Sequence, residues 1–149
     1  MELKKYQKGV LKDLDTYIEN ILFTRNTGRA YDKLWQDKGV RVGGMKGIQL
    51  YNDILAGVPN VCFKVPTGGG KTILGCAALK HIFGAMGRDK KKVVVWLVPW
   101  ETILTQTYNN LKNPTHFYRE RLNRDFSSRV EIYNKQQALY GANFNPSAV

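Results

Sequence analysis

The stretch "FKVPTGGGKT", Phe63 to Thr72, places three consecutive glycines directly before a lysine and a threonine. A loop with so few side chains lets another group approach the backbone closely. The apolar run Asn60–Val65 before it predicts a strand, and the apolar residues from Lys71 to about Met86 predict a helix. A strand, a glycine-rich turn and Gly-Lys-Thr at the start of a helix form the pattern of a P-loop, which binds nucleoside triphosphates.

Each part of this pattern has a chemical role in phosphate binding. Lys71 would reach the β- and γ-phosphates, and the Thr72 hydroxyl would ligate the Mg²⁺ of the nucleotide. Backbone N–H groups would wrap the phosphates, assisted by the positive end of the helix dipole. The residues of this cradle would be Thr67, at its edge, with Gly68, Gly69 and Gly70. The general spacing puts a glycine where this chain has Val65, and the alternative interpretation is a tight turn without a ligand.

The rest of the pattern predicts an α/β protein with a parallel sheet, because strand-like and helix-like segments alternate after residue 59. Apolar residues at intervals of three and four predict a helix over 3–23, and shorter helical pieces are expected around 31–38 and 48–55. Beyond the glycine loop we expect a strand over 91–99 that is buried on both faces, a helix over 101–111, a third strand over 129–134, and loops over 113–128 and 141–149.

Composition and charge place the chain among globular proteins with a polyanionic partner. It has 149 residues, 43% of them hydrophobic, and a formal net charge of +11. Such a balance favours nucleic acid as the partner, whereas the alternative is a surface that is merely basic. Basic residues cluster at Lys90–Lys92 and at Arg119, Arg121, Arg124 and Arg129.

Apolar segments and cysteines exclude two other classes of protein. No apolar run approaches the ~18 residues of a membrane helix, and the N-terminus lacks the apolar core of a signal peptide. We therefore expect a cytoplasmic protein without a membrane partner. Cys62 and Cys76 lack metal-ligand spacing and make no disulfide framework, so we expect two buried, reduced thiols.

The sequence "PTGGGKT" resembles motif I of superfamily-two helicases. The longer string "VPNVCFKVPTGGGKT" and the opening "MELKKYQKGVLKDLDTYI" are similar to the helicase-like restriction (res) subunit of type III restriction enzymes. This resemblance implies ATP and Mg²⁺ as cofactors and DNA as the partner, although charge does not distinguish DNA from RNA. It implies a helical segment over residues 1–58 and the front part of a RecA-like P-loop domain over residues 59–149.

The resemblance also gives a role to two residues near the N-terminus. Gln7 matches the glutamine that these proteins place upstream of motif I, where its amide reads the edge of the adenine. Tyr6 would then pack near the base. The alternative interpretation is that Gln7 is a polar residue on the exposed face of the first helix.

The stretch "LVPWETILTQT" is similar to motif Ia, which touches the nucleic-acid backbone in these helicases. The family pattern falls on Pro99, Trp100, Ile103 and Gln106, with Trp100 in place of the usual threonine. Glu101 stands where many relatives carry an arginine that contacts a phosphate, although some DNA-translocating branches of the family carry glutamate there. The alternative is a helix that begins here and packs on the sheet, with Glu101 near its dipole.

No Asp-Glu dipeptide follows a hydrophobic strand, although ATP hydrolysis in this family needs that Walker B pair. We therefore expect an N-terminal fragment that is truncated before Walker B, binds nucleotide and hydrolyses it poorly. The parent enzyme would be an ATP-dependent helicase or translocase. Its partners would include the missing C-terminal motor domain and the methyltransferase subunit of a restriction complex. The alternatives are a nucleic-acid-binding module with a degenerate P-loop and a small-molecule P-loop kinase.

Overall fold

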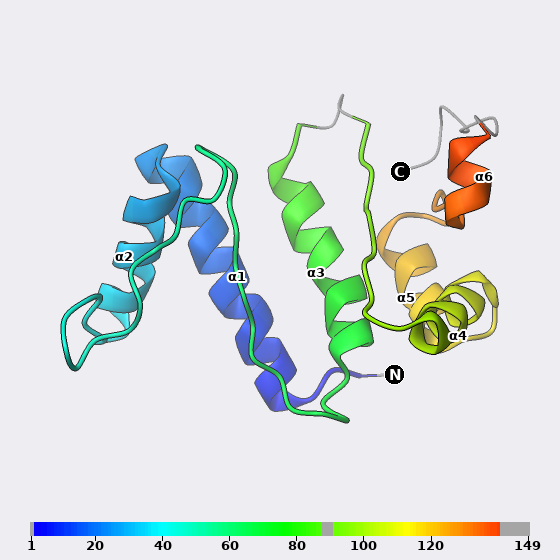
Figure 1. Ribbon diagram of the computed structural model, residues 1–149, viewed down its shortest axis with the longest axis horizontal. Helices are drawn as coiled ribbons and strands as arrows, with labels where there is room; N and C mark the ends of the chain where they lie inside the picture. The colour runs from blue at the N-terminus through cyan, green and yellow to red at the C-terminus, as the bar shows by residue number, and fades with distance from the viewer. Residues whose placement is uncertain (1, 88–90, 141–149) are drawn as a thin grey trace. The chain divides into compact units, whose positions relative to one another are not determined.

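The computed structural model describes residues 2–87 and 91–140, and these residues form six α-helices joined by turns and extended segments (Figure 1). They divide into two compact units, which are Glu2–Gly69 and the residues from Gly70 onward. Each unit has a buried hydrophobic cluster of its own. The glycine loop of the sequence contains the boundary between the two units.

The first unit is built on a pair of helices, α1 (Lys5–Thr24) and α2 (Thr27–Asp37). The helix predicted over 3–23 is confirmed, because the residues at intervals of three and four form its buried face. The buried residues of this face are Gln7, Leu11, Leu14, Tyr17 and Asn20. Tyr17 packs against Ala30 and Leu34 of α2, and these three residues form the core of the unit.

A short turn at Arg25 and Asn26 joins the two helices. Arg25 has φ 55° and its N–H donates to the Ile21 carbonyl, which ends α1 with a left-handed residue. The Asn26 side chain accepts a hydrogen bond of 2.8 Å from the Arg29 N–H and caps α2. The helix was predicted around 31–38 from its apolar side chains. These local bonds explain why α2 begins four residues earlier, at Thr27.

The second unit contains α3 (Lys71–Ala85), α4 (Glu101–Lys112), α5 (Phe117–Asp125) and α6 (Lys135–Leu139). The helices predicted over Lys71–Met86 and 101–111 are therefore confirmed. The core of this unit consists of Cys76, Leu111, Leu122 and Phe126. Partly buried side chains surround it, namely Leu79, Phe83, Trp96, Tyr118, Val130 and Ile132.

The predicted parallel sheet, and with it the RecA-like α/β fold, is wrong. The described residues include no β-strand, and their only bridge is an isolated parallel pair between Val42 and Ile48. Residues 60–65 and 91–98 are extended, as their β-branched and aromatic side chains favour. An extended segment becomes a strand only when a neighbouring strand pairs with its backbone, and these two segments form no ladder within the described chain.

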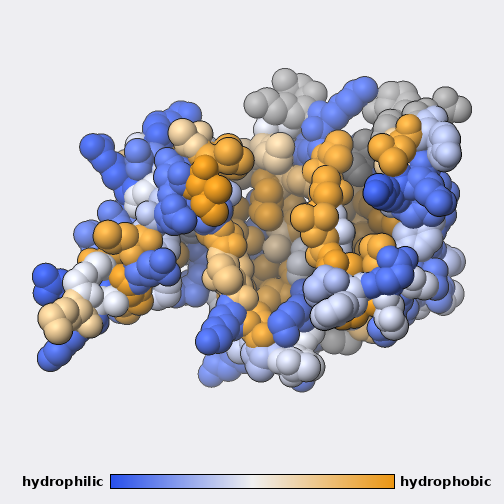
Figure 2. All heavy atoms as spheres, viewed as in Figure 1, coloured by the Kyte–Doolittle hydropathy of each residue, from blue (hydrophilic) through white to orange (hydrophobic). Residues whose placement is uncertain are grey.

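The segment 91–98 also differs from the expectation that both of its faces are buried. Alternate side chains on one face are exposed, with Val93, Val95 and Leu97 accessible at 80%, 77% and 86%. Figure 2 shows hydrophobic surface along this segment. Trp96, on the other face, packs against the core cluster of the second unit. The segment therefore lies on a helical core by one face and leaves an apolar row open on the other.

Three further predictions failed for local reasons. No helix forms over 48–55, where Tyr51 instead receives hydrogen bonds from Asn60 in an irregular segment. The region 113–128 is not only loop, because His116 caps α5 within it by accepting from the Tyr118 N–H. The segment 129–134 has no regular secondary structure. The predicted loop over 141–149 lies outside the described residues.

Candidate nucleotide-binding site

The glycine loop begins with a tight turn over Pro66–Gly69. The Gly69 N–H donates to the Pro66 carbonyl at 3.0 Å. Gly68, the third residue of the turn, has φ +73°, a value that belongs to a type II turn and favours glycine. The turn therefore requires at least one of the three consecutive glycines for its backbone conformation.

The second part of the loop forms the start of α3. Gly70 is the N-cap residue with φ 73° and ψ 45°, and its carbonyl accepts from the Leu74 N–H at 3.0 Å. As a glycine, Gly70 has no side chain that could cap the first turn of the helix. Lys71 is the first helical residue and is exposed, and Thr72 is half-buried. A helix N-terminus that begins with a glycine and a lysine suits an anion such as a phosphate.

The carbonyl of Gly69 is held by two side chains from the start of α1. The Tyr6 hydroxyl donates to it in a short hydrogen bond, and the Gln7 amide nitrogen donates to it at 3.0 Å. A Cβ atom on Gly69 would lie 2.7 Å from Val65 Cγ1 and 2.8 Å from the Pro66 carbonyl oxygen. Gly69 is therefore enclosed on all sides and leaves no room for a side chain.

Gln7 is only 1% exposed, so the alternative interpretation as a polar residue on an exposed face is wrong. Its amide oxygen accepts from the Lys4 N–H at 2.9 Å, at the start of α1, while its amide nitrogen donates to Gly69. One side chain thus connects the N-terminus of α1 to the glycine loop 62 residues later. Its role in reading adenine stays a prediction.

Sequence reasoning missed the contribution of Val65. This residue departs from the general P-loop spacing, and it is 9% exposed with its methyl group directed at Gly69. An apolar side chain at this position fills the space beneath the loop. In the sequence, the departure from the P-loop spacing was the only sign of the role of Val65. No local pattern indicates that Tyr6 and Gln7 contact the loop.

The residues that resemble motif Ia lie at and just after the start of α4. Trp100 is the N-cap residue, Pro99 precedes it, and Gln106 follows one and a half turns later; all three are exposed. Glu101 lies in the first turn, where its charge is favourable to the helix dipole. These side chains are accessible to a partner, and their contact with nucleic acid stays a prediction.

Two of the arginines in the predicted basic cluster serve the fold of the second unit. Arg119 donates to the Val130 carbonyl at 2.8 Å. Arg121 forms a short ion pair with Asp125, whose side chain is 6% exposed. Arg124 and Arg129 are exposed, and within this cluster the Asp125 carboxylate offsets the charge of Arg121.

The two cysteines have different environments. Cys76 is fully buried, and burial raises the pKa of its thiol to about 12. Cys62 is exposed, so the prediction that both thiols are buried is wrong for this residue. Within the described residues, no group of three or more His, Cys, Asp or Glu side chains could hold a metal ion.

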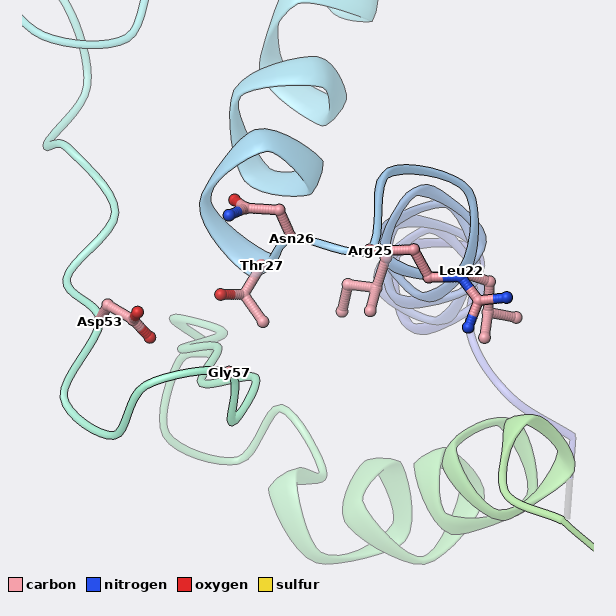
Figure 3. Close-up of a pocket in the computed structure, with 7 residues that line it drawn as sticks. Leu22, Arg25, Asn26, Thr27, Asp53 and Gly57 are labelled. Atoms are coloured by element: carbon pink, nitrogen blue, oxygen red, sulfur yellow. The ribbon is translucent and has the colours of Figure 1, made fainter.

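A shallow cavity of about 270 Å³ lies in the first unit, between the end of α1, the start of α2 and the segment around Asp53 and Gly57 (Figure 3). Ile21 and Leu22 contribute its apolar part, and Arg25 is its basic residue. It contains none of the residues predicted to bind nucleotide.

In residues 2–87 and 91–140, no helix is long and apolar enough to cross a membrane.

The Pro-Thr-Gly-Gly-Gly-Lys-Thr loop that opens α3 resembles motif I of helicase-like proteins, and Gln7 lies upstream of it. Residues 1–141 match the family described as type III restriction enzyme, res subunit, and the chain belongs to this family. The resemblance predicted from the sequence is thereby confirmed. Comparison with curated proteins and with solved structures gave no significant match. The family points to a helicase-like ATPase that acts on DNA within restriction–modification complexes.

Proposed function

We propose that the glycine loop binds ATP together with Mg²⁺, and that it does so for a DNA helicase or translocase of a type III restriction system. The observation that carries this proposal is the start of α3. Gly70 is the N-cap residue and has no side chain, and Lys71 is exposed at the first position of the helix. Phosphate-binding loops use the same combination of a glycine backbone, a helix N-terminus and a lysine.

Each residue has a role in this proposal. The backbone of Gly68, Gly69 and Gly70, with Thr67 at the edge, would surround the phosphates. Lys71 would neutralise the β- and γ-phosphates, and Thr72 would ligate the Mg²⁺ that the nucleotide brings. Bound Mg²⁺ would supply the charge that offsets the phosphates. The lack of space for a Cβ atom at Gly69 supports a loop built from bare backbone.

Tyr6 and Gln7 would connect the base to this loop. In the structure the Gln7 amide donates to Gly69 and accepts from Lys4. To read the edge of adenine, the amide would exchange one of these hydrogen bonds for the base. Binding of adenine would then change the hydrogen bonding of the Gly69 carbonyl directly.

The proposal places nucleic acid at the start of α4, on Pro99, Trp100 and Gln106. Because the chain has no Asp-Glu pair after a hydrophobic strand, we expect it to bind ATP and to hydrolyse it slowly. ATP hydrolysis and movement along DNA would belong to an enzyme that carries the acidic pair.

Calorimetric titration with ATP and Mg²⁺ tests the proposal. Lys71→Ala should weaken binding by about 100-fold, which corresponds to the loss of a charge-assisted contact of about 2.7 kcal/mol. Lys64→Ala is the matched control, since Lys64 is an exposed lysine of the same stretch and precedes the loop. It should change the affinity by less than about threefold, in keeping with an exposed charge.

Equal affinities of the wild-type chain and Lys71→Ala would contradict the proposal. Thermal unfolding of both proteins controls for the fold, because Lys71 is exposed and its loss should leave unfolding cooperative. A phosphorylated small molecule formed from ATP would instead favour the kinase alternative.

A further inference from the structure

A second glycine-rich element lies in the first unit, in the stretch "RVGGMKGI" at residues 41–48, which we name the glycine turn. Its ends pair through the bridge between Val42 and Ile48. The Gly43 N–H donates to the Ile48 carbonyl at 2.8 Å, and the Ile48 N–H donates to the Arg41 carbonyl at 2.9 Å. A Cβ atom on Gly47 would lie 2.1 Å from the Gly43 carbonyl oxygen, so the turn can close only with glycine there.

Contacts with α2 hold the base of the glycine turn on both sides. Before the turn, the Val40 N–H donates to the Trp35 carbonyl at 2.8 Å. After it, the Tyr31 hydroxyl donates to the Gln49 carbonyl at 3.0 Å, and the Tyr51 ring lies 5.5 Å from the Tyr31 ring. The tip is therefore presented from a fixed base, which lowers the entropy cost of binding through it.

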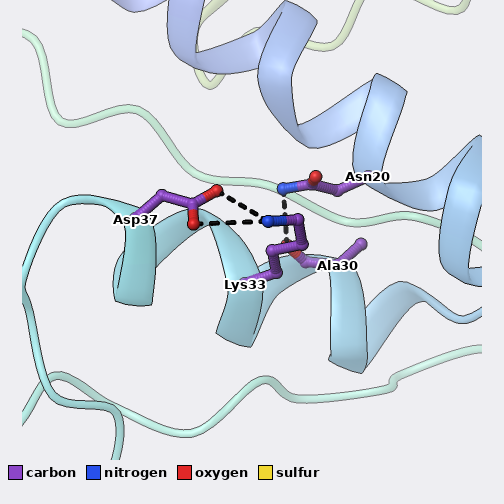
Figure 4. A network of polar contacts seen from close by, with 4 residues as sticks. All are labelled: Asn20, Ala30, Lys33 and Asp37. Carbon is purple, nitrogen blue, oxygen red and sulfur yellow. Dashed lines mark hydrogen bonds and ion pairs between the residues drawn. The ribbon is translucent and has the colours of Figure 1, made fainter.

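The helix that carries this base is itself fixed to α1. The Asn20 amide donates to the Ala30 carbonyl of α2 at 3.4 Å, and Lys33 pairs with Asp37 along the exposed side of α2 at 3.1 Å (Figure 4). The exposed ion pair adds little stability, whereas the buried Asn20 contact joins the two helices.

The tip exposes one apolar and two basic side chains. Met45 is 106% exposed, so its side chain meets no neighbour. Arg41 and Lys46 are exposed as well, and among the described residues no carboxylate forms an ion pair with either of them. The sequence from Lys38 to Asn52 contains no Asp or Glu. A bare methionine between two cations complements an anionic partner that has an apolar interior.

We propose that the glycine turn is a second contact with double-stranded DNA, separate from α4. Arg41 and Lys46 bind phosphates on either side of a groove, and Met45 enters the groove against the sugars and bases. The inference rests on the DNA partner of the proposed function. Duplex DNA fits because it offers closely spaced phosphates beside apolar sugar and base surfaces, which the two cations and the methionine match.

Fluorescence anisotropy with a labelled 20-base-pair duplex tests the inference on the full chain in about 50–200 mM salt. Arg41→Gln/Lys46→Gln should weaken binding about tenfold in mid-range salt and reduce the slope of log affinity against log salt by about 2. Lys12→Gln/Lys135→Gln removes the same charge from exposed lysines elsewhere and is the matched control. It should leave the affinity within about threefold of wild type.

Met45 provides a test that does not depend on charge. Met45→Ser should weaken duplex binding about threefold without changing the salt slope, and Met45→Leu should restore most of the affinity. Equal losses in the two double variants would overturn the inference, since net charge alone would then explain the binding. A Met45→Ser variant that binds like wild type would also overturn the assignment of the tip to the groove.

Two further measurements separate this inference from the proposed function. Vesicles of phosphatidylserine should bind the wild-type chain and Arg41→Gln/Lys46→Gln alike; a selective loss of vesicle binding would make the turn a membrane contact and overturn the inference. ATP titration of Arg41→Gln/Lys46→Gln should match wild type. ATP binding without duplex binding would overturn the inference alone, and duplex binding through the turn without ATP binding would overturn the proposed function alone.

Discussion

The glycine loop and the glycine turn both need glycine, but the groups that exclude a side chain differ between them. In the loop, a Cβ atom on Gly69 would meet the side chains of Val65 and of Tyr6 from α1, as well as the Pro66 carbonyl of its own turn. In the turn, Gly47 is required because the chain meets its own backbone at Gly43. The glycine loop depends on contacts with the rest of the first unit. The glycine turn is closed by its own backbone hydrogen bonds and contacts α2 only at its base.

The difference extends to hydrogen bonding and exposure. The Gly69 carbonyl is bound by residues that precede it by 62 and 63 positions, whereas the bonds that close the glycine turn stay within residues 41–48. Gly69 is buried, and Met45 at the tip of the turn is fully exposed. A damaged loop should therefore disturb the fold of the first unit, and a damaged turn should disturb only what the tip touches.

The largest expected effect is on stability, from Gly69→Ala compared with Gly44→Ala. Overpacking against Val65 and the Pro66 carbonyl should lower the free energy of unfolding by about 3 kcal/mol. Gly44 has φ +77° with nothing near its Cβ position, so alanine there should cost only about 1 kcal/mol of backbone strain. Urea unfolding gives both values, and hydrogen exchange of the α1 amides locates the damage.

Similar losses for the two variants would show that the enclosure of Gly69 costs an alanine no more than the backbone strain at Gly44 does, because Gly69 itself has no positive φ. ATP titration of Gly69→Ala sharpens the result further. The affinity should fall with the stability if the enclosed loop is the phosphate cradle.

Most helices could be predicted from the sequence, whereas the contacts that hold the glycine loop could not. The apolar period of α1, the largely apolar stretch of α3 and the apolar side of α4 are local patterns, so these helices were predicted within a few residues. The helix around 48–55 failed because its apolar spacing competes with glycine and proline nearby and with the hydrogen bonds that Tyr51 receives.

The sequence could not show whether the strand-like segments pair into a sheet, and the reason is physical. Strand propensity describes how well a residue fits a paired, half-buried surface, and "VVVWLV" scores highly for that reason. Pairing itself is a contact between distant segments, and no local pattern provides it. The bond from Gln7 to Gly69 escaped prediction for the same reason, although the importance of both residues was predicted.

The next effect in size is that of Gln7→Ala, with Gln49→Ala as the exposed control in the same unit. Removal of a buried amide with two hydrogen bonds should cost about 2 kcal/mol of stability, and the control should cost less than about 0.5 kcal/mol. Gln7→Ala should also reduce the preference for ATP over GTP, measured by calorimetry. An unchanged preference with reduced stability would make Gln7 a purely structural support of the loop.

The smallest effect is expected for Tyr6→Phe, which removes one hydroxyl from the Gly69 carbonyl while Gln7 still donates to it. The loss should be about 0.5–1 kcal/mol. The variant combined with Gln7→Ala is more informative, because it leaves a buried carbonyl without its two side-chain donors. The combined loss should then exceed the sum of the single losses by about 1 kcal/mol in a double-mutant cycle. Strict additivity would mean that water reaches Gly69 once either side chain is gone, and that the loop resembles the open glycine turn more closely than its burial indicates.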